Sequence, residues 1–208
     1  MGRGRAANDE DQREMILARA AELFARGGYP GTSMNQVAEA CGLSNATLYH
    51  YYKDKYELLV NIADGHVSRL QRIVRETLSE PLPAEAQMRE LIARLVEEYA
   101  NAQHAHRVLT EDVKFLDTAD RERVLDKERE VVRGFAEVVG ALRPDLQDAA
   151  MSKPLTMLLF GMVNWLFTWM KPEGPLDYRA MAPMVADLFL GGLGAVEASQ
   201  ALPRQRRA

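Results

Sequence analysis

Cysteine and long apolar runs are nearly absent from this 208-residue sequence. Its single cysteine, Cys41, excludes an intrachain disulfide and a multi-cysteine metal site. The most apolar segment covers residues 155–170 and includes Asn164, so it is shorter than the roughly 20 apolar residues of a membrane span. No apolar stretch follows the arginines near the N-terminus, so neither a signal peptide nor a membrane partner is expected. We therefore expect a cytoplasmic protein.

Motifs of catalysis and cofactor binding are also scarce. The glycines of "GGLGA" (191–195) follow a helical pattern rather than a strand, so they do not form a phosphate-binding loop. His104 and His106 lie two residues apart without a carboxylate at ligand spacing, which is a poor pattern for a metal site. No combination of Ser, His and acidic residues stands out as a catalytic trio. We expect no enzymatic activity, no cofactor and no metal.

Charge is close to balanced, with a net value of −4. The whole chain is therefore not attracted to nucleic acid, and any contact with DNA must use a local patch. Aromatic and basic residues are concentrated in "GLSNATLYHYYKDKYELL" (42–59), directly after a glycine. Side chains of these types build a core poorly but suit contact with a polar, negatively charged surface.

Helical periodicity runs through the chain, and no segment shows a sustained period of two. The first helix is expected to begin near Asn8–Asp11, where Asn and Asp can cap it, and to end at the glycines of 27–31. Ser33, followed three residues later by Gln36, fits a capping box that opens a short helix over 34–40.

A glycine turn separates this short helix from the next. Gly42 supplies a left-handed residue that ends the first of the pair, and Ser44 caps a second helix over 45–51. Asp54 with Glu57 caps a longer helix that begins near residue 55. Two short helices joined in this way predict a helix-turn-helix, pinned to the first helix by apolar residues that include Leu48.

The remaining sequence predicts long helices only. We place them at 55–78, 84–104, 106–116, 119–142, 155–171 and 177–199. Pro154 either opens its helix or kinks a longer one that starts near Leu146. The fold class is therefore all-α with about nine helices: a helix-turn-helix domain over residues 1–60 and a second helical domain over 61–208.

The second helix of a helix-turn-helix fits the major groove of DNA, with base contacts near its N-terminus and phosphate contacts around it. Hydroxyl, amide, aromatic and ammonium groups in and beside this helix suit those contacts. The candidates are Ser33, Ser44, Asn45, Thr47, Tyr49, His50, Lys53 and Lys55. The alternative is a three-helix bundle in which the tyrosines are half-buried.

The segment "ILARAAELFARGGYPGTSMNQVAEACGLSNATLYHYYKDKYELL" (16–59) closely resembles the N-terminal domain of the TetR family of transcriptional regulators. The resemblance implies that Tyr49 and His50 face DNA, that Lys55 contacts a phosphate and that Leu48 belongs to the core. It also implies a homodimer that binds palindromic operator DNA, with an all-helical C-terminal domain for effector binding and dimerisation.

The last two helices of such regulators normally form the dimer interface. The final helix here carries an apolar stripe wider than one monomer face needs, and its glycines allow close approach of a partner. The interface candidates are Met181, Met184, Val185, Leu188, Phe189 and Gly192. A core within one monomer is the alternative.

The segment "GMVNW…TWMKPEGPL" (161–176) resembles a TetR subgroup that controls fatty-acid, aromatic-acid and sterol-side-chain degradation and is released from DNA by acyl-CoA thioesters. An amide and a hydroxyl on one face of so apolar a helix need partners, from a ligand carbonyl or from a neighbouring helix. The indoles either line an acyl tunnel or belong to core or interface. The ligand candidates are His66, Phe115, Asn164, Trp165, Thr168 and Trp169.

The sequence thus predicts a homodimeric repressor that leaves operator DNA when a hydrophobic effector of the acyl-CoA class binds. The alternatives are a TetR-type regulator with a different hydrophobic ligand, one with no effector, and an enzyme, for which the sequence offers little.

Overall fold

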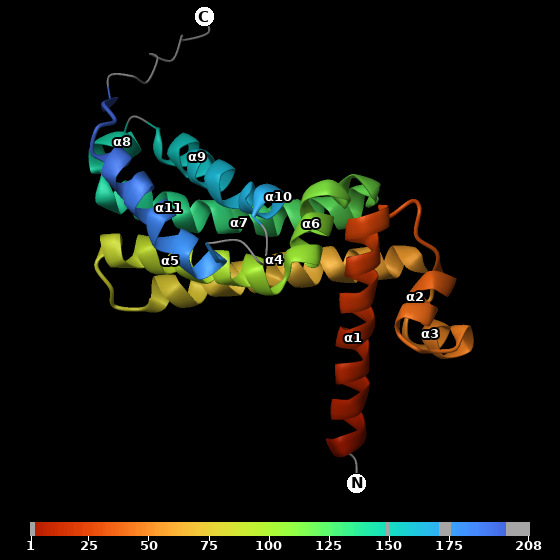
Figure 1. Cartoon of the computed structure of the whole chain (residues 1–208). Coiled ribbons are helices and arrows are strands. Elements are labelled where there is room, and N and C mark those ends of the chain that lie inside the picture. The colour runs from red at the N-terminus through yellow and green to blue at the C-terminus, as the bar shows by residue number, and fades with distance from the viewer. Residues whose placement is uncertain (1–2, 149, 171–175, 199–208) are drawn as a thin grey trace, which may run out of the picture. The chain divides into compact units, whose positions relative to one another are not determined.

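Only helices form regular structure in the part of the chain that the computed structural model describes, which is residues 3–148, 150–170 and 176–198 (Figure 1). The predicted all-α class is confirmed. In chain order the elements are α1 (Arg3–Gly27), α2 (Met34–Ala40), α3 (Asn45–Tyr51), α4 (Lys55–Ser79), α5 (Ala84–Asn101), α6 (Gln103–Glu111), the 3-10 helix η1 (Val113–Phe115), α7 (Thr118–Leu142), α8 (Pro144–Asp148), α9 (Ser152–Asn164), α10 (Leu166–Trp169) and α11 (Tyr178–Leu193). None of these described helices is long and apolar enough to cross a membrane.

The helices gather into two compact units. The first unit contains the described residues up to Arg69 together with Ala102–Lys127, and the second contains Leu70–Asn101 together with the described residues from Glu128 onward. The division falls within α4 and α7, so it does not coincide with the domain boundary expected after residue 60. The assignment of residues 1–60 to a separate DNA-binding domain stays a prediction.

Polar links explain why the first unit extends beyond the helix-turn-helix. The Tyr56 hydroxyl of α4 donates to Asp120 Oδ2 at 2.8 Å and accepts from the backbone N–H of Asp117 at 3.0 Å. Burial raises the pKa of this phenol to about 12. Through this link the first turn of α4 is tied to the first turn of α7 in the same unit.

The predicted helix-turn-helix is present, with the predicted bounds. Ser33 Oγ accepts from the Gln36 backbone N–H at 3.3 Å, and Gln36 Oε1 accepts from the Ser33 N–H at 2.8 Å, which completes the capping box. Gly42 has a φ of 65°, and Ser44 Oγ accepts from the Thr47 N–H at 3.1 Å to cap α3. Each boundary follows from a side chain or a backbone angle within a few residues of it.

One helix start and one capping bond differ from expectation. α1 begins at Arg3, about one turn before Asn8, because the preceding alanines and arginines favour helix and only Gly4 opposes it. At α4, Asp54 Oδ1 accepts from the Glu57 N–H at 2.8 Å as predicted. The Glu57 carboxylate, however, accepts from the backbone N–H of Lys53 at 2.7 Å, so the reciprocal bond is displaced by one residue.

The core of the first unit lies between α1, α2, α3, α6 and the start of α4. Leu48 is 0 % exposed, as predicted, and Phe24 and Val37 are also fully inside. Tyr52 is only 3 % exposed, so it is a core residue as well. Leu43, in the turn between α2 and α3, is only half-buried.

The second unit is built around α5 and α11, which pack together, with α9 against α11. The helix expected over 155–171 is divided at Trp165 into α9 and α10, where the Thr168 hydroxyl donates to the Trp165 carbonyl at 2.7 Å. Pro154 lies in the first turn of α9, where a missing N–H is harmless. Since α8 is a separate short helix, Pro154 does not kink a helix that starts at Leu146.

Candidate DNA-binding and effector sites

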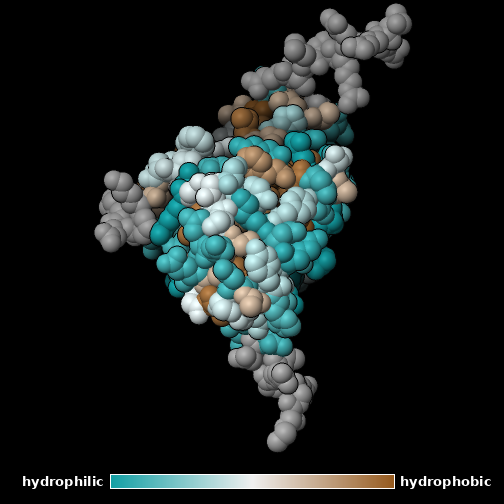
Figure 2. Space-filling model, turned by 90° about the vertical axis from the view of Figure 1, so that its right-hand side faces the viewer, coloured by the Kyte–Doolittle hydropathy of each residue, from teal (hydrophilic) through white to brown (hydrophobic). Residues whose placement is uncertain are grey.

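Helix α3, the second helix of the helix-turn-helix, presents one buried side and one exposed side. Leu48 closes the core, whereas Asn45, Thr47, Tyr49 and His50 are exposed, Tyr49 at 51 %. α2 and α3 pack against each other (Figure 1). The surface on the side where they lie, turned to the viewer in Figure 2, is predominantly hydrophilic. This surface is chemically suited to a charged, hydrated partner.

The hydroxyl candidates are engaged in helix caps. Ser44 Oγ lies 2.8 Å from Thr47 Oγ1 and also caps the Thr47 N–H. Ser33 Oγ belongs to the capping box of α2. The exposed hydroxyls can still accept one further bond, but their first role is to fix where α2 and α3 begin.

Asn45, Tyr49 and Lys53 are the least engaged of the candidates. Within the described residues, none of these three side chains has a hydrogen-bond or ionic partner, and each is exposed. Among the described residues, His50 makes only an edge contact with Tyr51, at 5.5 Å between ring centroids. These four side chains can therefore reach a base or a phosphate without breaking a bond within the chain.

The neighbouring tyrosines have a different role. The Arg13 guanidinium of α1 donates to the Tyr51 carbonyl at 3.1 Å and lies 5.5 Å and 5.7 Å from the ring centroids of Tyr51 and Tyr52. Burial raises the pKa of the Tyr52 phenol. The aromatic residues that are clustered in the sequence are thus divided between exposed positions, such as Tyr49, and structural positions, such as Tyr52.

Lys55 is not placed as expected for a phosphate contact. Its ammonium donates to the carbonyls of Tyr29 and Thr32 at 2.8 Å each and of Pro30 at 3.2 Å, and it lies 4.5 Å from the Tyr29 ring centroid. An ammonium group has three donors, so all of them have carbonyl acceptors here. The expected contact would require breaking these bonds.

His66, the first ligand candidate, is fully buried in the first unit. Its Nε2 lies 3.2 Å from Nδ1 of His106, which is 2 % exposed. Burial, together with the proximity of His66, lowers the pKa of His106 to about 3. The two rings link α4 to α6 as a buried pair.

Phe115 also belongs to the first unit. Its ring is 39 % exposed and lies 5.5 Å from the Tyr29 ring, centroid to centroid, beside the α1–α2 connection. This position favours the alternative of a packing residue. Its closing of a ligand pocket stays a prediction.

Asn164 has the most informative surroundings of the ligand candidates. The Tyr99 hydroxyl of α5 donates to Asn164 Oδ1 at 2.9 Å, and Tyr99 is 3 % exposed with its pKa raised by burial. The partner of the amide is therefore a tyrosine side chain rather than a neighbouring backbone. The amide N–H groups of Asn164 have no acceptor within the described residues, so they can donate to a ligand carbonyl.

The two tryptophans lie on the surface of the second unit. Trp165 is 66 % exposed and Trp169 is 52 % exposed. Two apolar residues of α9 are also exposed, Leu158 at 67 % and Met157 at 50 %. We call these four residues the α9–α10 stripe. Their exposure favours the interface interpretation over an internal acyl tunnel.

The six interface candidates of α11 divide between its two sides. Met181, Val185 and Phe189 are buried within the unit. Met184 and Leu188 are 46 % and 69 % exposed, and Gly192 is exposed with open space where a Cβ would lie. We call Met184 and Leu188 the α11 stripe. The wide apolar pattern thus serves the monomer core on one side and faces outward on the other.

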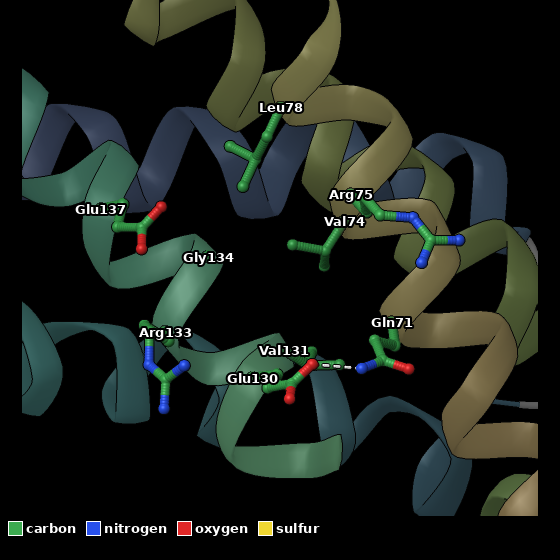
Figure 3. Close-up of a pocket in the computed structure, with 9 residues that line it drawn as sticks. All are labelled: Gln71, Val74, Arg75, Leu78, Glu130, Val131, Arg133, Gly134 and Glu137. Carbon is green, nitrogen blue, oxygen red and sulfur yellow. Dashed lines mark hydrogen bonds between the residues drawn. The ribbon is translucent and has the colours of Figure 1, made fainter. Parts of the chain in front are cut away.

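A groove between α4 and α7, of about 280 Å³, is the hollow drawn in Figure 3. Leu78 and Val74 point toward Gly134 and pack against it, the Gln71 amide donates to the Glu130 carboxylate, and Arg75 points outward (Figure 3). Its lining is Gln71, Val74, Arg75, Leu78, Glu130, Val131, Arg133, Gly134 and Glu137. No sequence motif marks this groove, although a glycine within a periodic helix signals close packing.

A second hollow, of about 420 Å³, lies between α5 and the ends of α7 and α11. It is lined by Glu85, Arg89, Leu142, Arg143, Asp187, Leu190, Gly191, Leu193 and Gly194. Neither of these two described hollows contains any of the six ligand candidates. No group of three or more His, Cys, Asp or Glu residues suited to a metal ion occurs in the described part of the chain.

Comparison with known proteins gives the context for this geometry. Residues 16–62 match the model of bacterial regulatory proteins of the tetR family, and residues 81–193 match that of the tetracyclin repressor-like C-terminal domain. The HTH-type transcriptional repressor KstR2 of Rhodococcus jostii is 25% identical over 188 residues, which cover 88% of this chain and 91% of the relative.

Two solved structures have the same fold. A TetR-family transcriptional regulator from Bordetella parapertussis is 32% identical with a TM-score of 0.81, covering 89% of this chain and 97% of that one. AibR, in complex with isovaleryl coenzyme A and operator DNA, is 21% identical with a TM-score of 0.70, covering 87% and 97%. These proteins are regulators rather than enzymes, in agreement with the sequence prediction. Together with the two family models, which span the helix-turn-helix and most of the following helices, they show that this chain belongs to the TetR family of transcriptional regulators.

Proposed function

We propose that this regulator is a homodimeric repressor that binds palindromic operator DNA and is released by a hydrophobic effector of the acyl-CoA class. The observation that carries the proposal is the two-sided recognition helix α3. Leu48 anchors its inner side at 0 % exposure, while Asn45, Tyr49 and His50 are exposed on its outer side. A rigid helix with unengaged polar side chains is what reading of base edges requires.

The α9–α10 and α11 stripes support the homodimer. Leu158, Trp165 and Leu188 are each about two-thirds exposed, and leaving the exposed part of a leucine of this kind in water forgoes roughly 1–2 kcal/mol. Open space beside Gly191 and Gly192 lets another helix approach closely. A second copy of the chain, related by a twofold axis, would cover both stripes with the same elements.

A twofold dimer determines the form of the operator. Each copy presents one α3, so the DNA needs two inverted half-sites whose centres lie about 34–36 Å apart on B-DNA. An effector that changes this separation lowers operator affinity, and a coupling of about 1–3 kcal/mol corresponds to roughly 5–150-fold.

Two observations support an acyl-CoA effector. AibR, whose fold this chain shares, is described in complex with isovaleryl coenzyme A and operator DNA. In this chain Tyr99 holds Asn164 by its amide oxygen, so the amide N–H groups remain as donors for a thioester carbonyl. We assign that contact to Asn164, and we assign Trp165 and Trp169 to the dimer surface.

A TetR-type regulator with another hydrophobic ligand, or with none, is the second candidate. The observation in its favour is that the two described hollows are rimmed by charged side chains and exclude the six ligand candidates.

Thermal unfolding of the purified chain distinguishes these candidates. CoA thioesters of increasing chain length are compared with the matching free acids and with CoA alone. A thioester at about 100 times its Kd stabilises by about 2.7 kcal/mol, which for a chain of this size raises Tm by about 5–11 °C. Stabilisation by thioesters alone, together with release of a selected operator duplex, is the expected result. Equal shifts with free acids, or no shift with any compound, would contradict the acyl-CoA proposal and leave the DNA-binding function standing.

A further inference from the structure

We propose that Glu128 of α7 and Asn164 of α9 form a two-point site, which takes a ligand carbonyl with a hydrogen-bond donor a few ångströms away from it. Asn164 donates to the carbonyl, and the Glu128 carboxylate accepts from the neighbouring N–H or O–H group. The inference rests on the proposed binding of an effector and specifies the chemistry that the effector must carry.

Glu128 lies on the buried side of α7. Val124, Val131 and Phe135 are buried. They lie four residues before and three and seven residues after Glu128, so the four side chains follow one side of the helix. Glu128 itself is half-buried. A carboxylate in such a stripe loses hydration, and this loss needs a compensating partner.

No such partner occurs in the described part of the chain. The Glu128 carboxylate makes neither a hydrogen bond nor an ion pair with a described residue. Burial raises the pKa of this carboxyl group, and the charge of the neighbouring Arg129 offsets only part of the rise. A carboxyl group that burial perturbs and that no partner compensates is more typical of a binding site than of a core.

The packing of α7 on α9 indicates which residues lie near Glu128. The Phe135 ring meets the Phe160 ring edge-on, at 5.0 Å between centroids. The two helices run in opposite directions (Figure 1). Glu128 precedes Phe135 by seven residues, about 10 Å, and Asn164 follows Phe160 by four residues, about 6 Å. Both polar residues therefore lie toward the same end of the α7–α9 contact.

Tyr99 of α5 provides an independent link between the two residues. Its hydroxyl donates to Asn164 Oδ1 at 2.9 Å. Burial raises the pKa of the same phenol, and the negative charge of Glu128 raises it further, so the carboxylate lies near the ring. All three residues belong to the second unit. Three helices thus bring a donor and an acceptor together.

The chemistry of the ligand follows from the hydrogen-bond roles that are already filled. Tyr99 occupies the amide oxygen of Asn164, so Asn164 offers N–H donors to a ligand. An ionised Glu128 offers acceptors only. The complement is a carbonyl beside an N–H or O–H group. A CoA thioester supplies the second group in two ways, from a hydroxyl on the acyl chain or from an amide of the pantetheine arm.

Two matched pairs of probes test the site by calorimetric titration of the full-length chain. N-methyloctanamide has an N–H group beside its carbonyl, whereas methyl octanoate has the carbonyl alone. β-Hydroxybutyryl-CoA and butyryl-CoA differ by one hydroxyl group. The variants are Glu128→Leu, the milder Glu128→Gln and, as the matched control, Glu137→Leu at an exposed position of the same helix.

The unmodified chain and Glu137→Leu should bind the amide more tightly than the ester, by roughly 10- to 150-fold. Glu128→Leu should bind the amide and the ester alike. Glu128→Gln should retain part of the preference, because its side-chain oxygen still accepts a hydrogen bond. If Glu128→Leu binds every probe as the unmodified chain does, including no binding by either, the proposal is overturned.

The CoA pair identifies the source of the donor and tests the proposed function separately. A preference for the hydroxylated thioester that Glu128→Leu abolishes assigns the donor to the acyl chain. Equal weakening of both thioesters assigns it to the pantetheine arm. If neither thioester binds the unmodified chain and the amide does, the acyl-CoA effector fails while the two-point site stands.

Thermal unfolding of the free chain separates a binding role from a structural one. Since an unpaired carboxylate on a buried stripe costs free energy, Glu128→Leu should keep or raise the Tm. Loss of affinity without loss of Tm is the expected combination. A lower Tm together with unchanged affinity for the probes would show that Glu128 serves folding and would overturn the proposal.

Discussion

Replacing Leu188 by Glu should dissociate the proposed dimer. Leu188 is 69 % exposed on α11, and complete burial of a leucine side chain is worth roughly 1.5–3 kcal/mol. Covering the exposed part therefore contributes about 1–2 kcal/mol per copy, or about 2–4 kcal/mol for the two copies of a twofold interface. This corresponds to a dimer Kd about 30- to 700-fold higher, before any cost of burying the new carboxylate.

Sedimentation equilibrium over a range of chain concentrations measures this change. Arg179→Ala is the matched control on the same helix. The Arg179 side chain is 84% exposed, and its ion pair with Glu97, at 3.5 Å, contributes little to stability because it lies in water. The control should dissociate like the unmodified chain. If Leu188→Glu does so too, the α11 stripe does not form the interface and the reasoning from exposed apolar area is refuted.

Three further predictions concern stability. Leu48→Ala should lower the free energy of unfolding by about 2–5 kcal/mol, measured by chemical denaturation, because Leu48 is 0 % exposed. Ser44→Ala should lower it by about 0.5–2 kcal/mol, since the cap on the Thr47 N–H is removed; Ala46→Gly is a helix-propensity control in the same turn. The pKa of His106 is lowered to about 3 in the folded chain, so this residue binds a proton more readily when the chain is unfolded. Its contribution to the free energy of unfolding is therefore complete above pH 6.5 and is lost as pH falls. At pH 5 the free energy of unfolding should be lower by about 2 kcal/mol. Unfolding of His106→Gln should lack this component, and an identical pH profile would contradict the buried neutral histidine.

The helix-turn-helix was predictable because its boundaries are local. Ser33, Gly42 and Ser44 each act on backbone groups within a few residues, so their side-chain chemistry determines where α2 and α3 begin and end. The buried position of Leu48 followed from periodicity in the same way. The agreement is therefore closest where sequence neighbours are also the structural partners.

The role of Lys55 could not be inferred in this way. Its acceptors lie 23 to 26 residues earlier in the chain, and their convergence depends on how the α1–α2 connection turns. From the sequence, an exposed cation beside a recognition helix is indistinguishable from one that is already engaged.

The sequence could not distinguish ligand-binding residues from interface residues, for a different reason. α9 and α11 are apolar on most of their circumference, so periodicity identifies them as helices without showing which side is covered. Trp165 and Leu188 lie outward, while Phe160 and Phe189 lie inward. Only the packed structure distinguishes these positions.

Gly134 shows how a missing side chain can fix a distance. A Cβ at this position would collide with Val74 Cγ1 and lie 3.2 Å from Leu78 Cδ1, so α4 and α7 approach as closely as they do only because residue 134 has no side chain. The neighbours Arg133 and Glu137 are exposed. Tolerance to substitution should therefore change abruptly along one turn of α7, from permissive at the two charged positions to forbidding at the glycine between them. In a set of diverged descendants of this protein, that contrast would remain as a record of the helix spacing.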